Sequence, residues 1–87
     1  MKEKININFK KAQSSIAKII EMNESNAYCI DIMQQNLAVI GLLKSAHQML
    51  LEAHLKSCFA KAMKTNNEKR KKEMIEEILR VSKMAGK

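Results

Sequence analysis

The strongest constraint on the fold of this chain is one long stretch, Tyr28 to Cys58, with the composition of an uninterrupted helix. It contains no proline, and its single glycine is Gly41. Alanine, leucine, methionine, glutamine and lysine dominate the stretch, and all five residue types favour helical backbone. A helix of this length sets the architecture, because the rest of an 87-residue chain must be organised around it.

The same stretch carries both cysteines and both histidines of the chain. His54 and Cys58 are four residues apart, which places their side chains on one face of a helix, where they can bind one small ion. Cys29 lies 25 residues before His54, on the order of 37 Å along a helix axis. Cys29 therefore cannot reach His54 of its own chain, and a site that uses all three residues needs two chains.

Two-fold symmetry then determines how the two chains pair. An antiparallel pair with Cys29 of one chain opposite the histidine and second cysteine of the other has its axis near Leu42 and Leu43. These leucines would pack against their symmetry mates, and Gly41 would allow close approach of the backbones. The spacing predicts an antiparallel dimer with one copy of the site at each end.

The composition favours an all-α fold that gains buried surface by association. Hydrophobic residues make up 46% of the chain but aromatic residues only 3%, so the apolar surface is aliphatic and suits helix packing. No alternating strand pattern occurs, and both glycines are isolated. A chain this short buries only a modest core by itself. We predict one domain, residues 1–87, that forms oligomers.

Three helical segments, short, long and short, are expected. Apolar residues at three- and four-residue spacing predict the first over residues 5–22. Turn-forming residues 23–26 then reverse the chain, and the second helix is expected over residues 26–64. Residues 65–67 end it, and the third helix is expected over residues 68–84. The long helix has more than one apolar stripe, so it needs a partner subunit as well as the first helix, which predicts an antiparallel four-helix-bundle dimer.

The net charge of the chain is +7, with 16 Lys and Arg against 9 Asp and Glu. This excess suits a nucleic acid or another anionic partner, but it is equally typical of a solvated helical surface. The opening residues have no apolar signal region, and no apolar run is long enough to span a membrane. We expect a cytoplasmic protein without membrane contact, whose two cysteines are ligands or redox groups rather than a structural disulfide.

Two thiolates and one imidazole are soft donors, which select Cu(I), zinc or iron–sulfur clusters. Three such donors without a fourth suit trigonal Cu(I) better than structural zinc, although zinc with a bound water stays open. Each residue alone has a simpler interpretation. An isolated cysteine on a buried helix commonly acts as a small hydrophobic residue, and an isolated histidine as an ordinary hydrogen-bonding side chain.

Two segments, NAYCIDIMQQ and LLEAHLKSCFAKA, resemble the copper-sensitive operon repressor (CsoR) family of small helical bacterial metal sensors. Members of that family show Tyr-Cys-x-Asp followed by His-x3-Cys at the same separation, and the resemblance covers residues 26–63. Cys29, His54 and Cys58 look like the copper branch, because the nickel and cobalt branch carries histidine at the third position and the persulfide-sensing branch lacks the histidine. The resemblance implies Cu(I) bridging two subunits, in a disc-shaped tetramer made of two antiparallel dimers.

The resemblance also implies residues that support the metal ligands. Tyr28 matches the tyrosine of the family, and the family's glutamate in the last helix is expected at Glu77, with Glu73 as the alternative. Their expected role is to hold His54 in one orientation and to sense the ring when copper binds. The simpler interpretation of either glutamate is an exposed charge without a specific role.

The chain departs from the family where DNA is recognised. DNA-binding members carry an arginine-rich segment of the form RLKRIEGQ in the first helix and another arginine in the middle of the second. Here the first segment is NFKKAQSS, residues 8–15, and Ser45 takes the place of the second arginine. Lysines remain that could hold phosphates, namely Lys10, Lys11, Lys18 and Lys44. Because lysine lacks the bidentate fork of arginine, we expect weak operator recognition.

The leading hypothesis from the sequence is therefore a cytoplasmic Cu(I) buffer or chaperone that passes copper to a partner protein and binds operator DNA weakly or not at all. The alternative is a copper-responsive repressor that releases DNA when Cu(I) binds. A redox switch that joins Cys29 and Cys58 of partner chains is a third hypothesis. We do not expect an enzyme, because Cys58 near His54 is the only nucleophile–base pair and no cleft orients it.

Overall fold

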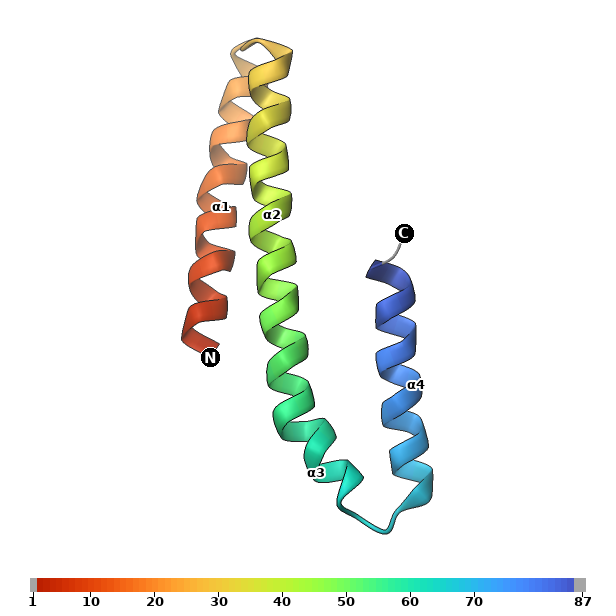
Figure 1. The fold of residues 1–87 in the computed structure, drawn as a ribbon. Coiled ribbons are helices and arrows are strands. Elements are labelled where there is room, and N and C mark those ends of the chain that lie inside the picture. The colour runs from red at the N-terminus through yellow and green to blue at the C-terminus, as the bar shows by residue number, and fades with distance from the viewer. Residues whose placement is uncertain (1, 86–87) are drawn as a thin grey trace. The chain divides into compact units, whose positions relative to one another are not determined.

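The computed structural model describes residues 2–85, which are helical except for two short connections. Its elements are α1 (Lys2–Glu24), α2 (Cys29–His54), the π-helical turn η1 (Leu55–Phe59), α3 (Ala60–Met63) and α4 (Glu68–Ala85), drawn in Figure 1. The expected all-α fold with short, long and short helical segments is confirmed, and α2, η1 and α3 together form the long segment. Within the described residues, no helix is both long and apolar enough to cross a membrane.

The chain forms two compact units, Met1–Glu52 and Ala53–Lys87. The first unit contains α1 and most of α2, and the second contains the last two residues of α2 together with η1, α3 and α4. The expectation of a single domain over residues 1–87 stays a prediction.

The reversal between α1 and α2 depends on Asn26, whose backbone has a φ of 59°. The Ala27 N–H donates to the Met22 carbonyl at 2.9 Å, and the Asn26 N–H donates to the Asn23 carbonyl at 3.3 Å. This pair of bonds is a Schellman motif, and asparagine is one of the few residue types that adopt its left-handed conformation readily. Because Asn26 closes α1, the next helix begins at Cys29 and not at residue 26 as expected.

The helices α1 and α2 run side by side (Figure 1), as expected for antiparallel neighbours. Between them they bury a narrow seam of small and aliphatic side chains, Ile5, Ala12, Val39 and Ala46, each at most 6% exposed. Two of these four are alanines, which let the helix backbones come close together. The α1–α2 pair is therefore held by one thin apolar seam.

A second apolar stripe on α2 is left exposed. Ile30, Met33, Leu37, Ile40 and Leu43 follow one another at three- and four-residue spacing, and their exposed fractions lie between 39% and 65%. Complete burial of one such side chain contributes about 1.5–3 kcal/mol, so covering five half-exposed ones would contribute roughly 5 kcal/mol per chain. The stripe agrees with the prediction that α2 needs a second neighbour.

The long segment is not one continuous α-helix, as was expected over residues 26–64. It widens into the π-helical turn η1 directly after His54. There the Ser57 hydroxyl donates to the Ala53 carbonyl at 2.6 Å. A hydroxyl that bonds a carbonyl one turn back competes with the backbone ladder and often bends a helix. Single π-helical turns of this kind are frequent at functional sites.

The start of α4 has a complete N-cap. The Asn67 side-chain oxygen accepts the Arg70 N–H at 3.1 Å, and the Asn67 carbonyl accepts the Lys71 N–H at 3.1 Å. The Thr65 hydroxyl donates to the Ala62 carbonyl at 2.7 Å at the end of α3. These bonds explain why the polar residues 65–67 separate two helices and why α4 begins at Glu68, as expected.

Candidate metal centre

His54 and Cys58 lie within one helical turn of each other in the second unit. His54 is the last residue of α2, and Cys58 lies in η1. A four-residue offset is slightly more than one turn of an α-helix and slightly less than one turn of a π-helix, so both side chains project from the same side. The two side chains therefore share one side of the helix in the π-helical turn as well, and their role as metal ligands stays a prediction.

The Cys58 thiol is free and exposed. The Ser57 Oγ lies 3.9 Å from Cys58 Sγ, a long contact even for sulfur. The hydroxyl has one proton, and the 2.6 Å bond to the Ala53 carbonyl takes it. The cysteine sulfur thus remains available to a metal ion, beside a turn whose shape Ser57 helps to set.

Cys29 is the first residue of α2, and its thiol is also free and exposed. The α-helix from Cys29 to His54 is unbroken, so the separation on the order of 37 Å derived from the helical rise applies. Among the described residues of one chain, no three His, Cys, Asp or Glu side chains lie close enough together to hold a metal ion. A site with Cys29, His54 and Cys58 across two chains stays a prediction.

The expected supporting residues have other partners in this chain. Arg70 Nη1 lies 3.4 Å from Glu73 Oε2 and 3.6 Å from Glu77 Oε1. The His54 side chain has no hydrogen bond or ion pair with any described residue. Sequence reasoning missed Arg70 as the shared partner of the two glutamates, although its position three and seven residues before them on α4 is the signal for it.

Tyr28 precedes α2 and is 69% exposed. Its carbonyl accepts the Asp31 N–H at 3.0 Å and the Ile32 N–H at 3.2 Å, which forms the first turn of α2. The phenol ring itself is open to solvent. Tyr28 thus lies beside Cys29 at the start of the helix, and its expected role toward His54 stays a prediction.

The four lysines expected to contact DNA all belong to the first unit and are exposed, Lys10, Lys11 and Lys18 on α1 and Lys44 on α2. An open hollow of about 540 Å³ is lined by Ile7, Lys10, Lys11, Ser14, Ser15 and Leu42. Leu42 is partly buried there, whereas Leu43 is 41% exposed. Of the two leucines expected at the dimer axis, Leu43 is therefore the one that α2 offers to a partner.

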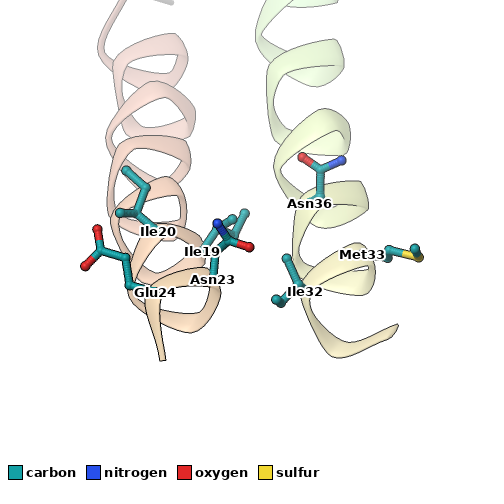
Figure 2. Close-up of a pocket in the computed structure, with 7 residues that line it drawn as sticks. All are labelled: Ile19, Ile20, Asn23, Glu24, Ile32, Met33 and Asn36. Carbon is teal, nitrogen blue, oxygen red and sulfur yellow. The ribbon is translucent and has the colours of Figure 1, made fainter. Parts of the chain in front are cut away.

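A second hollow, of about 390 Å³, lies between α1 and α2 near the hairpin turn and is shown in Figure 2. Its lining consists of Ile19, Ile20, Asn23, Glu24, Ile32, Met33 and Asn36. In Figure 2 Ile19 and Asn23 point toward α2, while Met33 points away from α1. No cysteine or histidine lines this hollow, so it is separate from the candidate metal ligands.

The sequence is similar to those of bacterial copper-sensing transcriptional repressors. The copper-sensing transcriptional repressor CsoR of Mycobacterium ulcerans is 43% identical over 54 residues, which are 62% of this chain and 46% of that protein. The CsoR of Bacillus subtilis is 33% identical over 66 residues, 76% of this chain and 65% of that protein. The matches thus span less than half of the mycobacterial relative and about two thirds of the Bacillus one. Both relatives are copper-sensing transcriptional repressors.

The fold has a solved counterpart. The crystal structure of the copper-sensing repressor CsoR with Cu(I) from Geobacillus thermodenitrificans matches with a TM-score of 0.85 and 32% sequence identity, over 98% of this chain and 85% of that chain. The sequence profile of the family described as metal-sensitive transcriptional repressor matches residues 1–84. This chain therefore belongs to the family of metal-sensitive transcriptional repressors, among relatives of the CsoR type.

Proposed function

We propose that this protein is a copper-responsive transcriptional repressor, which binds DNA when it is free of metal and releases it when it binds Cu(I). The relatives, named as copper-sensing repressors, support this function over the buffer or chaperone first expected from the sequence. Neither these relatives nor the matched structure gives support to a copper-transfer partner. The single observation that carries the proposal is the pair of His54 and Cys58 on one side of the α2–η1 junction, with both thiols of the chain free and exposed.

The proposed ligands are Cys29 of one chain with His54 and Cys58 of its partner. Their chemistry fits Cu(I), because two thiolates and an imidazole are soft donors. These groups are not engaged elsewhere: both thiols are free and exposed, and the His54 imidazole has no hydrogen bond or ion pair with a described residue. Bound Cu(I) would link the two chains through these three side chains. No other cysteine occurs in the chain, so no alternative thiolate site competes.

The proposed assembly is an antiparallel dimer through the exposed stripe of α2, with two such dimers forming a tetramer. The stripe includes Leu43, and Gly41 adjoins it on the outer surface of α2, where an added Cβ would meet no described atom within 4 Å outside the adjoining residues and the local helix backbone. Both features suit close packing of α2 against its symmetry mate. We further propose that the protein acts in the cytoplasm, where its thiols stay reduced.

The supporting residues of the proposed site are Tyr28 and one of the two glutamates, Glu77 or Glu73. Because Arg70 lies between both carboxylates, one glutamate can orient His54 of the site while the other keeps the guanidinium. These ion pairs are about half exposed, so exchanging a partner costs little. Such a residue fixes the orientation of a ligand imidazole, and losing it typically weakens metal binding 10–100-fold.

DNA binding and its release by copper test the function directly. The metal-free protein should shift DNA from upstream of its own coding sequence, and addition of Cu(I) should abolish the shift. Cys58→Ala is the matched variant, because it should bind the same DNA but not release it with Cu(I). Tight Cu(I) binding without any shift of this DNA would instead favour the buffer, which the lysine-bearing segment 8–15 and Ser45 suggested.

A mixing experiment tests whether the site lies between chains. Cys29→Ala and Cys58→Ala homodimers each lack a thiolate at both sites, so each should bind Cu(I) weakly. A mixed dimer of the two variants has one site with both defects and one site with none. Tight binding of one Cu(I) per mixed dimer is therefore expected, measured in competition with a Cu(I) chelator. If the mixture does not regain tight binding of Cu(I), the site is not formed by Cys29 of one chain with His54 and Cys58 of its partner.

A further inference from the structure

The positive charge of this chain is concentrated in its second unit. Residues 53–87 contain ten Lys and Arg against four Glu, a net charge of +6, whereas residues 1–52 contain six Lys against five Asp and Glu, a net charge of +1. The lysines first expected to contact DNA all lie in the nearly neutral first unit. Since affinity for DNA is dominated by contacts to phosphates, the second unit is the stronger candidate for such contacts.

Four cations of the second unit form a stripe along α4. Lys69, Lys72, Arg80 and Lys83 fall within an arc of about 80° when successive residues are placed 100° apart around the helix. All four are exposed. From Lys69 to Lys83 the stripe extends for about 21 Å along the axis. We call these four residues the basic stripe.

The cations of the basic stripe are available, unlike their neighbours on α4. Arg70 is paired with Glu73 and Glu77, and Lys71 with Glu68 at 3.3 Å. None of the four stripe residues forms an ion pair with any residue of the described chain. Three of the four glutamates of α4 lie outside the arc of the stripe, and each forms an ion pair with Arg70 or Lys71. Only Glu76 lies within the arc.

We propose that the basic stripe of α4 binds the phosphate backbone of duplex DNA. The inference rests on the proposed repressor function for its biological purpose, and it assigns the phosphate contacts to a surface other than the α1 and α2 lysines. Lys69, Lys72 and Lys83 supply point charges, and Arg80 adds a planar fork that can hold two phosphate oxygens. Arg80 is the arginine of this chain whose guanidinium is not paired with glutamate.

Duplex DNA fits the stripe better than a membrane surface does. A basic helix that lies on a membrane needs bulky apolar side chains, commonly aromatic ones, beside its cations. The helix α4 has no Trp, Phe or Tyr, and its Met74 is buried at 2% exposure. The exposed apolar side chains of α4 are aliphatic or methionine, Ile75 and Leu79 on one flank of the stripe and Val81 and Met84 on the other, and none lies within its arc. A straight row of long cationic side chains on a rigid helix instead matches a line of phosphates.

The test measures the salt dependence of binding to a duplex of unrelated sequence, which reports phosphate contacts without operator recognition. The stripe variant is Lys72→Gln with Lys83→Gln, and the matched control is Lys10→Gln with Lys11→Gln. Each pair removes two positive charges, so a mere change in net charge affects both equally. The slope of log K against log salt is negative, and in the stripe variant it should become less steep by about 2 for each DNA-bound chain. In the control variant it should stay unchanged.

A loss of slope in the control but not in the stripe variant would overturn the proposal and assign the contacts to α1. Equal losses in both would overturn it too, since they would report net charge alone. No measurable duplex binding by the unmodified protein at about 50 mM salt would also overturn it. Anionic phospholipid vesicles serve as a further probe: loss of vesicle binding in the stripe variant with an unchanged DNA slope would identify a membrane surface instead. Failure of copper to release the upstream DNA would refute the repressor function and leave this result standing.

Discussion

Replacing Gly41 with alanine has two effects in the proposed dimer, one on the helix propensity of α2 and one on packing between the two chains. Gly41 is in the interior of α2, and beyond the adjoining residues and the local helix backbone no described atom lies within 4 Å of the added Cβ. Within one chain the substitution therefore only improves helix propensity, by about 0.8–1 kcal/mol. In an antiparallel dimer whose backbones approach at Gly41, the same methyl group would overpack the interface and cost about 1–3 kcal/mol. The two effects have opposite signs.

Association and unfolding measured over a range of protein concentrations distinguish them, since oligomer stability depends on concentration. We expect the dimerisation Kd of Gly41→Ala to rise about 5- to 150-fold, the equivalent of 1–3 kcal/mol. Ala38→Gly, in the exposed part of the same helix, controls for propensity and should lower the free energy of unfolding by about 1 kcal/mol. Unchanged or tighter association of Gly41→Ala would show that the chains do not approach closely at this glycine.

Three further predictions concern the site. Ser57→Ala removes the 2.6 Å bond to the Ala53 carbonyl, and it should change the free energy of unfolding by about 0.5–1.5 kcal/mol and weaken Cu(I) binding, measured by chelator competition. Unaltered affinity would mean that the hydroxyl does not shape the site. Glu77→Gln should weaken Cu(I) binding about 10–100-fold, whereas Glu76→Gln should not; if Glu73→Gln acts in its place, the assignment of the two glutamates is reversed. Saturating Cu(I) should raise the melting temperature of the unmodified protein but not of Cys58→Ala.

Local patterns in this sequence were sufficient for the helices but not for their junctions. The apolar spacing of α1 and the break at residues 65–67 could be predicted, because both depend on residues near in sequence. The start of α2 was placed too early, since Asn26 can begin a helix or end one. Its left-handed φ of 59°, together with the bonds of the Schellman motif, assigns it to the end of α1.

The π-helical turn could not be predicted from composition. Residues 55–59 would suit an α-helix as well, and the change of register accompanies the bond of Ser57 to the backbone. That His54 and Cys58 project from the same side of the helix was predictable, because it depends only on their four-residue spacing. The partners of Glu73 and Glu77 were not, since a flexible arginine such as Arg70 can select among several carboxylates and only side-chain packing decides.

The division of the chain into units bears on how copper could control DNA binding. The boundary between Glu52 and Ala53 assigns Cys29 to the first unit and His54 with Cys58 to the second, which also carries the basic stripe. A site shared by Cys29 of one chain and His54 and Cys58 of another would therefore tie the second unit of one protomer to the first unit of its partner. Such a link restricts the orientations that α4 can adopt. A dimer binds DNA more weakly in an orientation that holds its two basic stripes away from the DNA backbone. The coupling then requires only that metal and DNA favour different orientations of the same unit.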